Sequence, residues 1–223
     1  MQNNKTKQII KKHYSKVAEG GGCCSCSCGG QDENEQIAKS IGYSKEEMKL
    51  AGGANLGLGC GNPVAMSKIK EGDFVLDLGC GAGFDCFLAS ERVGKNGKVV
   101  GVDMTEEMIR RAKLNAEKRG VKNVTFLCAE IENLPIKDDS VDIIITNCVI
   151  NLTPDKIKTF QEAYRVLRKW GRMYLSDIVL LKELSKEQRE DKNLLTGCVA
   201  GALLKEDYLS KIRKAGFKVN ILH

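Results

Sequence analysis

The chain has 223 residues, enough for one α/β domain with a full core and a small appendage. Its 42% hydrophobic and 29% charged content is ordinary for a soluble globular protein. The net charge of +6 is mild, and the densest lysine group, in residues 5–16, reads as a solvated helix face, which argues against a nucleic-acid partner. No apolar run is long enough to cross a membrane, and no signal-peptide segment follows Met1, so we expect a cytoplasmic protein without a membrane partner.

The 10 cysteines are the most unusual feature of the composition. In the reducing cytoplasm a structural disulfide framework does not persist. So many thiols there point towards soft-metal chemistry or redox turnover.

The N-terminal part of the chain predicts a helix, a thiol-rich loop and a polar segment. Residues 5–18 place Ile10, Tyr14 and Val17 near one face, as in an amphipathic helix. A glycine run ends this helix and is followed by four thiols, Cys23, Cys24, Cys26 and Cys28. Residues 31–36 are polar, and we expect them to be mobile.

Two short helices are predicted next. Residues 44–47 read Ser-Lys-Glu-Glu, which is a capping box at a helix start. Residues 52–63 are rich in glycine and contain Cys60. Pro63 is placed to begin another short helix, which we expect to reach Ile69.

From residue 73 onward strand and helix signals alternate. Strands are predicted at 74–78, 99–103, 124–129, 141–147 and 172–180. Helices are predicted at 84–92, 105–119, 154–168, 185–197 and 205–215, the third with Thr153 as its cap and Pro154 at its first position. This alternation implies an α/β fold with a doubly wound, mostly parallel sheet covered on both faces, and 218–222 reads as the start of a sixth strand. We therefore expect 1–72 to form N-terminal helices and a cysteine-rich loop that pack on a core domain at 73–223.

The rest of the chain is organised around a glycine loop. The apolar strand at 74–78 runs into Asp77-Leu-Gly-Cys-Gly-Ala-Gly83. Its glycines, Gly79, Gly81 and Gly83, stand at alternate places, so the dinucleotide fingerprint G-x-G-x-x-G is not met. A strand, glycine loop and helix in this order let a ligand approach the backbone and the N–H groups at the helix start.

This loop resembles the first motif of the Rossmann-like S-adenosylmethionine (SAM)-dependent methyltransferases. The next strand ends in Asp103, at the expected distance, and a carboxylate there can accept hydrogen bonds from both ribose hydroxyls. The resemblance implies that Glu130 and Ile131, after the third strand, meet the adenine, although Asp-Ala is more common at that place. It implies SAM as the cofactor, bound by Asp77, Gly79, Cys80, Gly81, Gly83, Asp103, Met104, Glu130, Ile131 and Asn147. The alternative is an ordinary glycine turn in another α/β protein.

The cysteines of this region fall into two groups. Three of them read as small buried hydrophobes: Cys80, Cys86 and Cys128. Cys60 lies in a glycine loop, Cys148 at a strand end beside the expected methyl donor, and Cys198 among small residues. Their spacing is too wide for a zinc finger, but three distant thiols could converge over one mouth of the sheet.

The segment Asn147-Cys-Val-Ile-Asn-Leu152, with Thr196-Gly-Cys198 and a His13-Tyr14 helix ahead of a cysteine cluster, is similar to the arsenite methyltransferases over nearly the whole chain. The resemblance implies that Cys148 and Cys198 bind trivalent arsenic, and that Cys60 and an N-terminal cysteine, Cys23 or Cys24, complete the binding and redox set. It implies methyl transfer from SAM to As(III) or its thiol conjugates, for arsenic detoxification. A thiol reductant of the thioredoxin or glutathione type would restore the cysteines, and we expect a monomer.

The residue types agree with this chemistry. Arsenic(III) is soft and thiophilic, so thiolates suit it as ligands. Three thiolates leave its lone pair free to attack the methyl of the SAM sulfonium, and no general base is required. This fits a chain whose only histidines are His13 and His223. Catalysis would then be mainly the placement of arsenic against the methyl group.

Two other interpretations stay open. A SAM methyltransferase of a small organic substrate, such as a quinone-type ring, would share the glycine loop and would not need Cys148 and Cys198. A thiol-rich sensor on the same scaffold would bind arsenite or zinc without methyl transfer. Nucleic-acid methylation is disfavoured, because no Asn-Pro-Pro-Tyr-type segment follows the fourth strand and no basic module is added.

Overall fold

A computed structural model describes residues 2–20 and 31–222. The predicted thiol loop with Cys23, Cys24, Cys26 and Cys28 lies outside the described residues.

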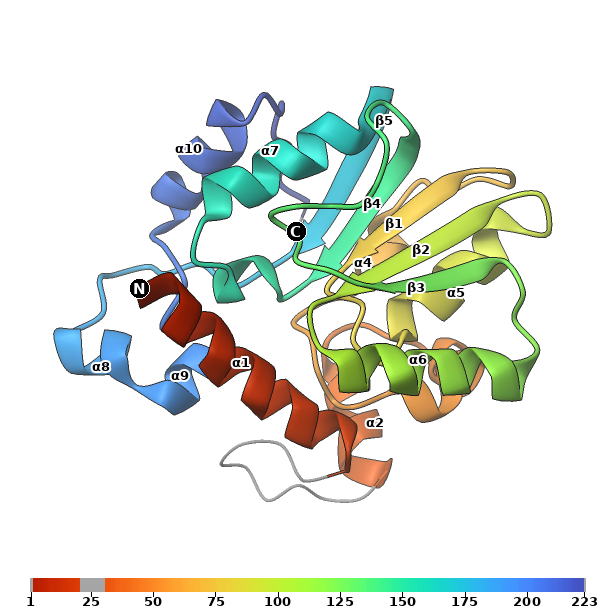
Figure 1. Cartoon of the computed structure of the whole chain (residues 1–223), viewed down its shortest axis with the longest axis horizontal. Coiled ribbons are helices and arrows are strands. Elements are labelled where there is room, and N and C mark those ends of the chain that lie inside the picture. The colour runs from red at the N-terminus through yellow and green to blue at the C-terminus, as the bar shows by residue number, and fades with distance from the viewer. Residues whose placement is uncertain (1, 21–30, 223) are drawn as a thin grey trace.

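The centre of the molecule is a parallel sheet (Figure 1). Its five strands are β1 (Phe74–Leu78), β2 (Lys98–Asp103), β3 (Val124–Cys128), β4 (Val141–Asn147) and β5 (Leu167–Ser176). They stand in the order β3-β2-β1-β4-β5, and every neighbouring pair is parallel. The chain winds from β1 towards β3 and then returns to β4 on the other side of β1. In an open sheet of this kind ligands bind outside the carboxyl ends of the strands, at that reversal.

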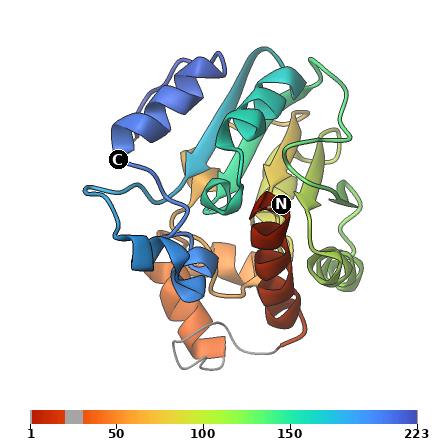
Figure 2. The ribbon, with the colours of Figure 1, turned by 60° about the vertical axis from the view of Figure 1, so that its left-hand side comes forward.

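Helices cover both faces of the sheet, which confirms the doubly wound α/β fold (Figures 1 and 2). One face carries α5 (Phe84–Val93) and α6 (Glu106–Arg119), and the other carries α7 (Lys156–Val166) and α10 (Lys205–Lys214). Alternate residues of β1 supply the two cores: Val75 packs with Phe87, whereas Leu76 and Leu78 pack with Phe160. Burying β1 on both faces requires its continuous apolar run.

The residues before the sheet form four α-helices within the described ranges: α1 (Gln2–Ala18), α2 (Gln31–Ser40), α3 (Lys45–Ala51) and α4 (Pro63–Met66). The capping box at Ser44 is confirmed, because its side chain accepts from Glu47 N while Glu47 bonds back to Ser44 N. Residues 31–36, which we expected to be mobile, are the first six residues of α2. Helix α1 lies against α6 and α9 (Lys192–Thr196), at the carboxyl edge of the sheet (Figure 1).

Several predicted boundaries are corrected. Helix α7 starts at Lys156 and is capped by Asp155, whose carboxylate accepts from Lys158 N at 3.0 Å, so Thr153 and Pro154 lie before it. The helix predicted at 185–197 is divided into α8 (Lys186–Glu190) and α9, because Asp191 has extended backbone and caps the second helix.

The end of the sheet also differs from the prediction. Strand β5 begins at Leu167, next to an irregular register with β4, and ends at Ser176 rather than at Leu180. Residues 218–222 form no strand, and within the described sheet β5 pairs only with β4. The alternating pattern of that segment forms no ladder with the open edge of β5.

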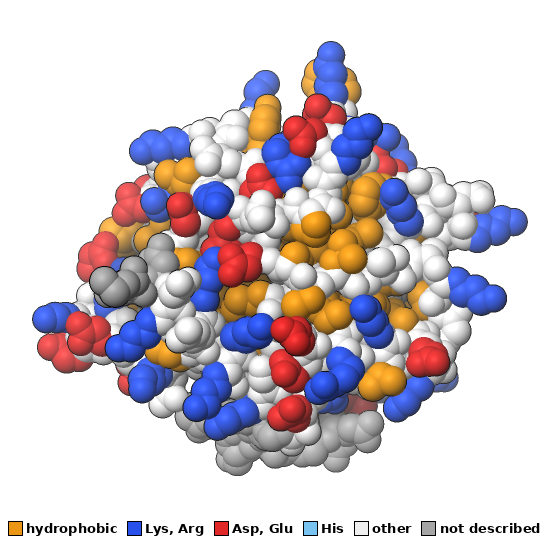
Figure 3. All heavy atoms as spheres, in the orientation of Figure 1, with side chains coloured by type: hydrophobic (Ala, Val, Ile, Leu, Met, Phe, Trp, Pro, Cys, Tyr) orange, Lys and Arg blue, Asp and Glu red, His pale blue; other side chains and the backbone are white. Residues whose placement is uncertain are grey.

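The surface carries mixed charge. On the face shown in Figure 3, Lys and Arg side chains are spread among Asp and Glu rather than gathered in one block. Across residues 2–20 and 31–222, none of the helices has the length and apolar character needed to span a bilayer.

Candidate active site

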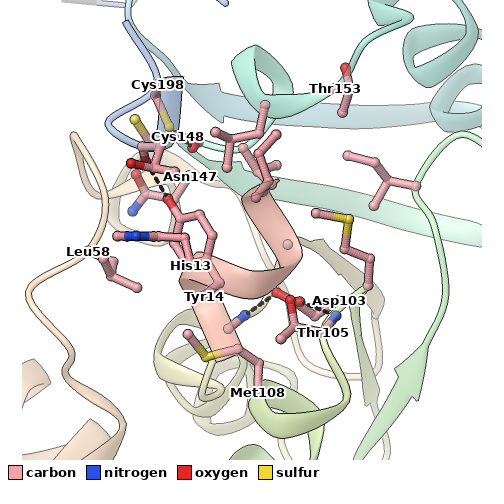
Figure 4. Close-up of a pocket in the computed structure, with 18 of the residues that line it drawn as sticks. His13, Tyr14, Leu58, Asp103, Thr105, Met108, Asn147, Cys148, Thr153 and Cys198 are labelled. Atoms are coloured by element: carbon pink, nitrogen blue, oxygen red, sulfur yellow. Dashed lines mark hydrogen bonds between the residues drawn. The ribbon is translucent and has the colours of Figure 1, made fainter. Parts of the chain in front are cut away.

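A cavity of about 260 Å³ opens at the carboxyl ends of β1, β2 and β4 (Figure 4). Its lining includes Gly79 and Gly81 of the glycine loop, Asp103 after β2, and Cys148 after β4. Helix α1 lies over the cavity and contributes Ile10, His13 and Tyr14 to its wall. The sheet reversal, the glycine loop and the predicted thiols thus share one hollow.

The glycine loop needs its glycines for two different reasons. Gly79, Gly81 and Gly83 all have positive φ, of 72°, 51° and 94°. A Cβ on Gly79 would run into Val149, and one on Gly83 would lie 2.9 Å from Phe126, so these two permit close packing behind the loop. A Cβ on Gly81 would meet nothing within 4 Å, because this residue faces the open cavity. A ligand can therefore approach the backbone at Gly81.

Asp103 is fixed by the backbone on both of its oxygens. Gly81 N donates to Oδ2 at 3.1 Å, and Thr105 N donates to Oδ1 at 2.8 Å. Burial raises the pKa of Asp103, and the Thr105 and Gly81 hydrogen bonds oppose that shift. Each carboxylate oxygen keeps a further lone pair, so a pair of hydroxyl donors in the cavity would find acceptors here.

The loop after β3 binds helix α1. Lys7 Nζ lies 2.6 Å from Glu130 Oε2 and 2.9 Å from Glu132 Oε1. Glu132 and Ile131 are buried and line the cavity together with Glu130. The Lys7 cluster thus links the helix over the cavity to the wall that the methyltransferase resemblance implies for adenine.

The three widely spaced cysteines come together. The ligand atoms of Cys60, Cys148 and Asp177 all lie within 4.8 Å of one another. Cys198 Sγ donates to the backbone oxygen of Cys148 at 2.8 Å, and all three cysteines line the cavity. Figure 4 shows the Cys148 and Cys198 sulfurs side by side above Asn147. The predicted convergence of thiols over one mouth of the sheet is present in the fold.

Two of these cysteines have strained backbone. Cys148 has φ of 57° and Cys198 has φ of 63°. The left-handed conformation costs a residue with a Cβ roughly 1–2 kcal/mol. Strain of this kind persists where surrounding structure imposes it, and it concentrates at functional sites. Here it turns two thiols towards the same hollow.

Two of the thiols, Cys60 and Cys148, are held in their protonated form. The hydrogen bond with Cys148, together with burial, raises the pKa of the Cys60 thiol well above its usual range. The hydrogen bond with Cys198, together with burial, does the same for Cys148. At neutral pH these residues therefore enter a reaction as thiols, and their protons must leave when they bind a thiophilic atom.

A partly buried carboxylate beside the thiols was missed from the sequence. Asp177 accepts hydrogen bonds from Tyr208 Oη at 2.8 Å, Asn151 Nδ2 at 2.8 Å and Ile178 N at 3.0 Å, and burial raises its pKa to about 6. The signal was its place directly after a strand end, which a strand assigned to 172–180 concealed.

Near Asp177, burial lowers the pKa of Lys156 to about 8, and the Lys156 ammonium group donates to two backbone oxygens.

Met104 and Asn147 also line the cavity, whereas Asp77 and Cys80 lie behind its wall. Asp77 is buried and accepts from Cys86 Sγ at 3.1 Å, and Cys80 is buried beside Cys86, as expected for small apolar thiols. Both Asp77 and Cys80 border a smaller cavity of about 80 Å³ on the other side of the loop. The expectation that Cys128 is buried is wrong, because it ends the edge strand β3 and is exposed.

Known proteins resemble the chain throughout. The profile of the methyltransferase domain family matches residues 69–216. An arsenite methyltransferase of Halobacterium salinarum is 42% identical over 96% of this chain and 57% of its own length. The human arsenite methyltransferase is 42% identical over 71% of this chain and 44% of its own length. The chain therefore spans about half the length of these curated relatives.

A solved structure agrees with the sequence comparison. The crystal structure of an arsenic(III) S-adenosylmethionine methyltransferase from Chlamydomonas reinhardtii matches with a TM-score of 0.66 and 38% identity, over 81% of this chain and 61% of that one. The family profile spans the strands, the glycine loop and both Cys148 and Cys198. The chain belongs to the methyltransferase domain family.

Proposed function

We propose that this protein transfers a methyl group from SAM to thiol-bound As(III) and so converts arsenite into methylated arsenicals. The observation that carries the proposal is one cavity lined by Cys60, Cys148, Cys198 and the glycine loop, in which the Cys148 sulfur lies within 4.8 Å of the Cys60 sulfur and the Cys198 thiol donates to the backbone oxygen of Cys148. The longer relatives named as arsenite methyltransferases support it.

The residues of the cavity fit the cofactor. Gly81 leaves open space where a side chain would stand, and Asp103 offers unused acceptor lone pairs beside it. Apolar walls come from Met104, Ile131 and Leu152. When bound, SAM supplies a sulfonium methyl group that a soft lone pair can attack.

The thiols act as ligands and as proton donors. Arsenous acid carries three hydroxyl groups, and each thiol that binds gives its proton to one of them, so three As–S bonds form as three waters leave. The raised pKa values of Cys60 and Cys148 do not oppose this exchange, because each proton passes to a leaving hydroxide. Arsenic in a three-thiolate site keeps its lone pair, which needs no base to become nucleophilic.

The chain contributes mainly position. The backbone strain at Cys148 and Cys198 fixes two ligands before arsenic arrives, and preorganised placement of two reactants can supply several kcal/mol of a barrier. Methylation removes two electrons from arsenic, and cysteine thiols can return them by forming a disulfide. An external reductant of the thioredoxin or glutathione class would then reduce that disulfide.

Product analysis tests the proposal. Pure protein would be incubated with arsenite, SAM and excess thiol, beside Cys148→Ser and the matched control Cys128→Ser, which changes an exposed thiol outside the cavity. We expect methylated arsenic from the wild type and from Cys128→Ser, and none from Cys148→Ser. Failure of the wild type to methylate arsenite while SAM still binds would refute the assignment and favour an organic substrate or a sensor.

A further inference from the structure

One predicted cofactor residue makes contacts that serve a cysteine. Asn147 Oδ1 accepts from Cys60 N at 2.9 Å, and Asn147 Nδ2 donates to Gly61 O at 2.7 Å. The side chain therefore holds the Cys60 loop from both sides of that residue. These contacts fix the amide orientation, because the oxygen must face an N–H and the nitrogen must face a carbonyl.

The loop is shaped to lie on this amide. Gly59 has φ of 110°, and a Cβ there would lie 2.8 Å from Asn147 Nδ2. A Cβ on Gly61 would collide with the hydroxyl of Ser176, on β5. The two glycines beside Cys60 thus let the backbone approach β4 and β5 closely. This close approach places the Cys60 thiol next to the Cys148 thiol.

Two buried residues, Tyr43 and Asp85, contact the Asn147 amide on its NH₂ side. Tyr43 Oη donates to Asp85 Oδ1 at 2.6 Å, and Asn147 Nδ2 reaches Tyr43 Oη at 2.9 Å and Asp85 Oδ2 at 3.3 Å. Tyr43 is 5% exposed and Asp85 is 8% exposed. Burying a carboxylate is costly, and the proposed methyl transfer makes no direct use of this one.

The network leaves the amide one orientation. An ionised carboxylate has no hydrogen-bond donor, and the Tyr43 hydroxyl uses its only hydrogen in the bond to Asp85. Both groups therefore present acceptors to Asn147. A reversed amide would turn its oxygen to these acceptors and its NH₂ to Cys60 N–H. With its oxygen also facing Gly61 O, the reversed amide would oppose like groups at all four contacts and would release the loop.

We propose that Asp85 and Tyr43 are positioning residues for Cys60: they orient the Asn147 amide, which holds the Cys60 thiol against Cys148. The inference rests on the proposed function, in which Cys60 is the third thiol ligand of arsenic. It assigns a purpose to a charge buried in the core and to the small residues around Cys60.

A double-mutant cycle tests the inference. As(III) would be bound to the protein, and its release to an excess small dithiol would be timed for wild type, Asp85→Asn, Cys60→Ser and the double variant. We expect Asp85→Asn to release arsenic roughly tenfold faster than wild type, and to add nothing in the Cys60→Ser background. Equal acceleration in both backgrounds would overturn the proposal, because Asp85 would then act elsewhere.

SAM affinity separates the proposed role from a cofactor role. We expect Asp85→Asn and Tyr43→Phe to bind SAM within about twofold of wild type, with a smaller gain in arsenic release for Tyr43→Phe, which keeps the carboxylate. A large loss of SAM affinity in Tyr43→Phe would contradict the proposal. Should Asp85→Asn not fold, as judged by circular dichroism, Tyr43→Phe carries the same cycle with Cys60→Ser.

A readout without arsenic distinguishes failure of this inference from failure of the proposed function. Dibromobimane bridges neighbouring thiols, and peptide mapping identifies the pair. We expect bridging of Cys60 to Cys148 in wild type and at least threefold slower bridging in Tyr43→Phe and Asp85→Asn. Unchanged bridging would overturn the positioning role, whether or not the wild type binds arsenic.

Discussion

The two sides of the cavity are built in opposite ways. The glycine-loop side comes from one continuous stretch, β1 and the turn to α5, with Asp103 from the neighbouring strand. The thiol side is assembled from three segments, with Cys60 before the sheet, Cys148 after β4 and Cys198 after α9. A local motif shapes the first side, whereas the second exists only once the whole chain has folded. Changes on one side should therefore leave binding to the other intact.

The largest effect is expected from Cys148. Cys148→Ser removes a proposed arsenic ligand with strained backbone at the centre of the thiol side, and arsenite methylation should fall by more than about a hundredfold. SAM binding, measured by calorimetry, should not change by more than about twofold, because the glycine loop does not depend on that thiol. Loss of SAM binding in this variant would show that the two sides are not separable.

The reciprocal change is Asp103→Ala. It removes both acceptors that face the cavity and frees the Gly81 and Thr105 N–H groups, so SAM affinity should fall roughly tenfold to a hundredfold. Arsenite binding, followed by the As–S absorbance in the near ultraviolet, should stay at the wild-type level. Asp103→Asn keeps one oxygen acceptor and should lose less; an equal or larger loss in Asp103→Asn would argue against the acceptor role.

The glycine-loop side was easier to predict from the sequence than the thiol side, because the first is a local motif and the second is assembled from distant segments. The strands β1 and β4 and the glycine loop were found at the right residues, because a buried run and its turn are local signals. The convergence of Cys60, Cys148 and Cys198 was only a possibility, since it depends on strand order. Asp177 was hidden because the end of β5 is set by pairing with β4 rather than by its own apolar pattern.

Side-chain direction was the part that sequence could not give. Asn147 was expected to bind the cofactor; it lines the cavity, and its amide contacts Cys60 and Gly61, which the sequence did not indicate. The partners that orient it, Tyr43 and Asp85, lie on different elements and are brought together only by packing. The positive φ of Cys148 and Cys198 could not be predicted from the sequence either, because cysteine is not a residue that favours this conformation.

A smaller effect is expected from Gly61→Ala. The added methyl group would collide with Ser176 and push the Cys60 loop away from Cys148, so As(III) affinity should fall roughly tenfold while SAM affinity holds. Gly120→Ala is the control: nothing lies within 4 Å of its Cβ position, so the added methyl group meets no neighbour, although Gly120, unlike Gly61, has positive φ, of 64°. Comparable arsenic affinities in the two variants would refute the steric argument for the loop.

The last prediction concerns stability rather than binding, through Lys156 and pH. Burial lowers its pKa to about 8 from 10.5, so the unfolded chain holds more protons than the folded one between these values. Stability contributed by this group therefore rises as pH increases from about 8 towards 10.5, by at most about 1.4 kcal/mol per pH unit. The unfolding free energy of wild type minus that of Lys156→Met should rise across this window in urea titrations. A flat difference would show that the ammonium group is not desolvated by folding.

The central claim is that three distant cysteines form one arsenic site beside the glycine loop. Arsenic K-edge X-ray absorption of the As(III) complex tests this most directly, because it counts sulfur neighbours. We predict three sulfur ligands in wild type and in Cys128→Ser, and two sulfurs with one oxygen in Cys60→Ser. Arsenic with no sulfur ligands, or an unchanged shell in Cys60→Ser, Cys148→Ser and Cys198→Ser alike, would contradict the account.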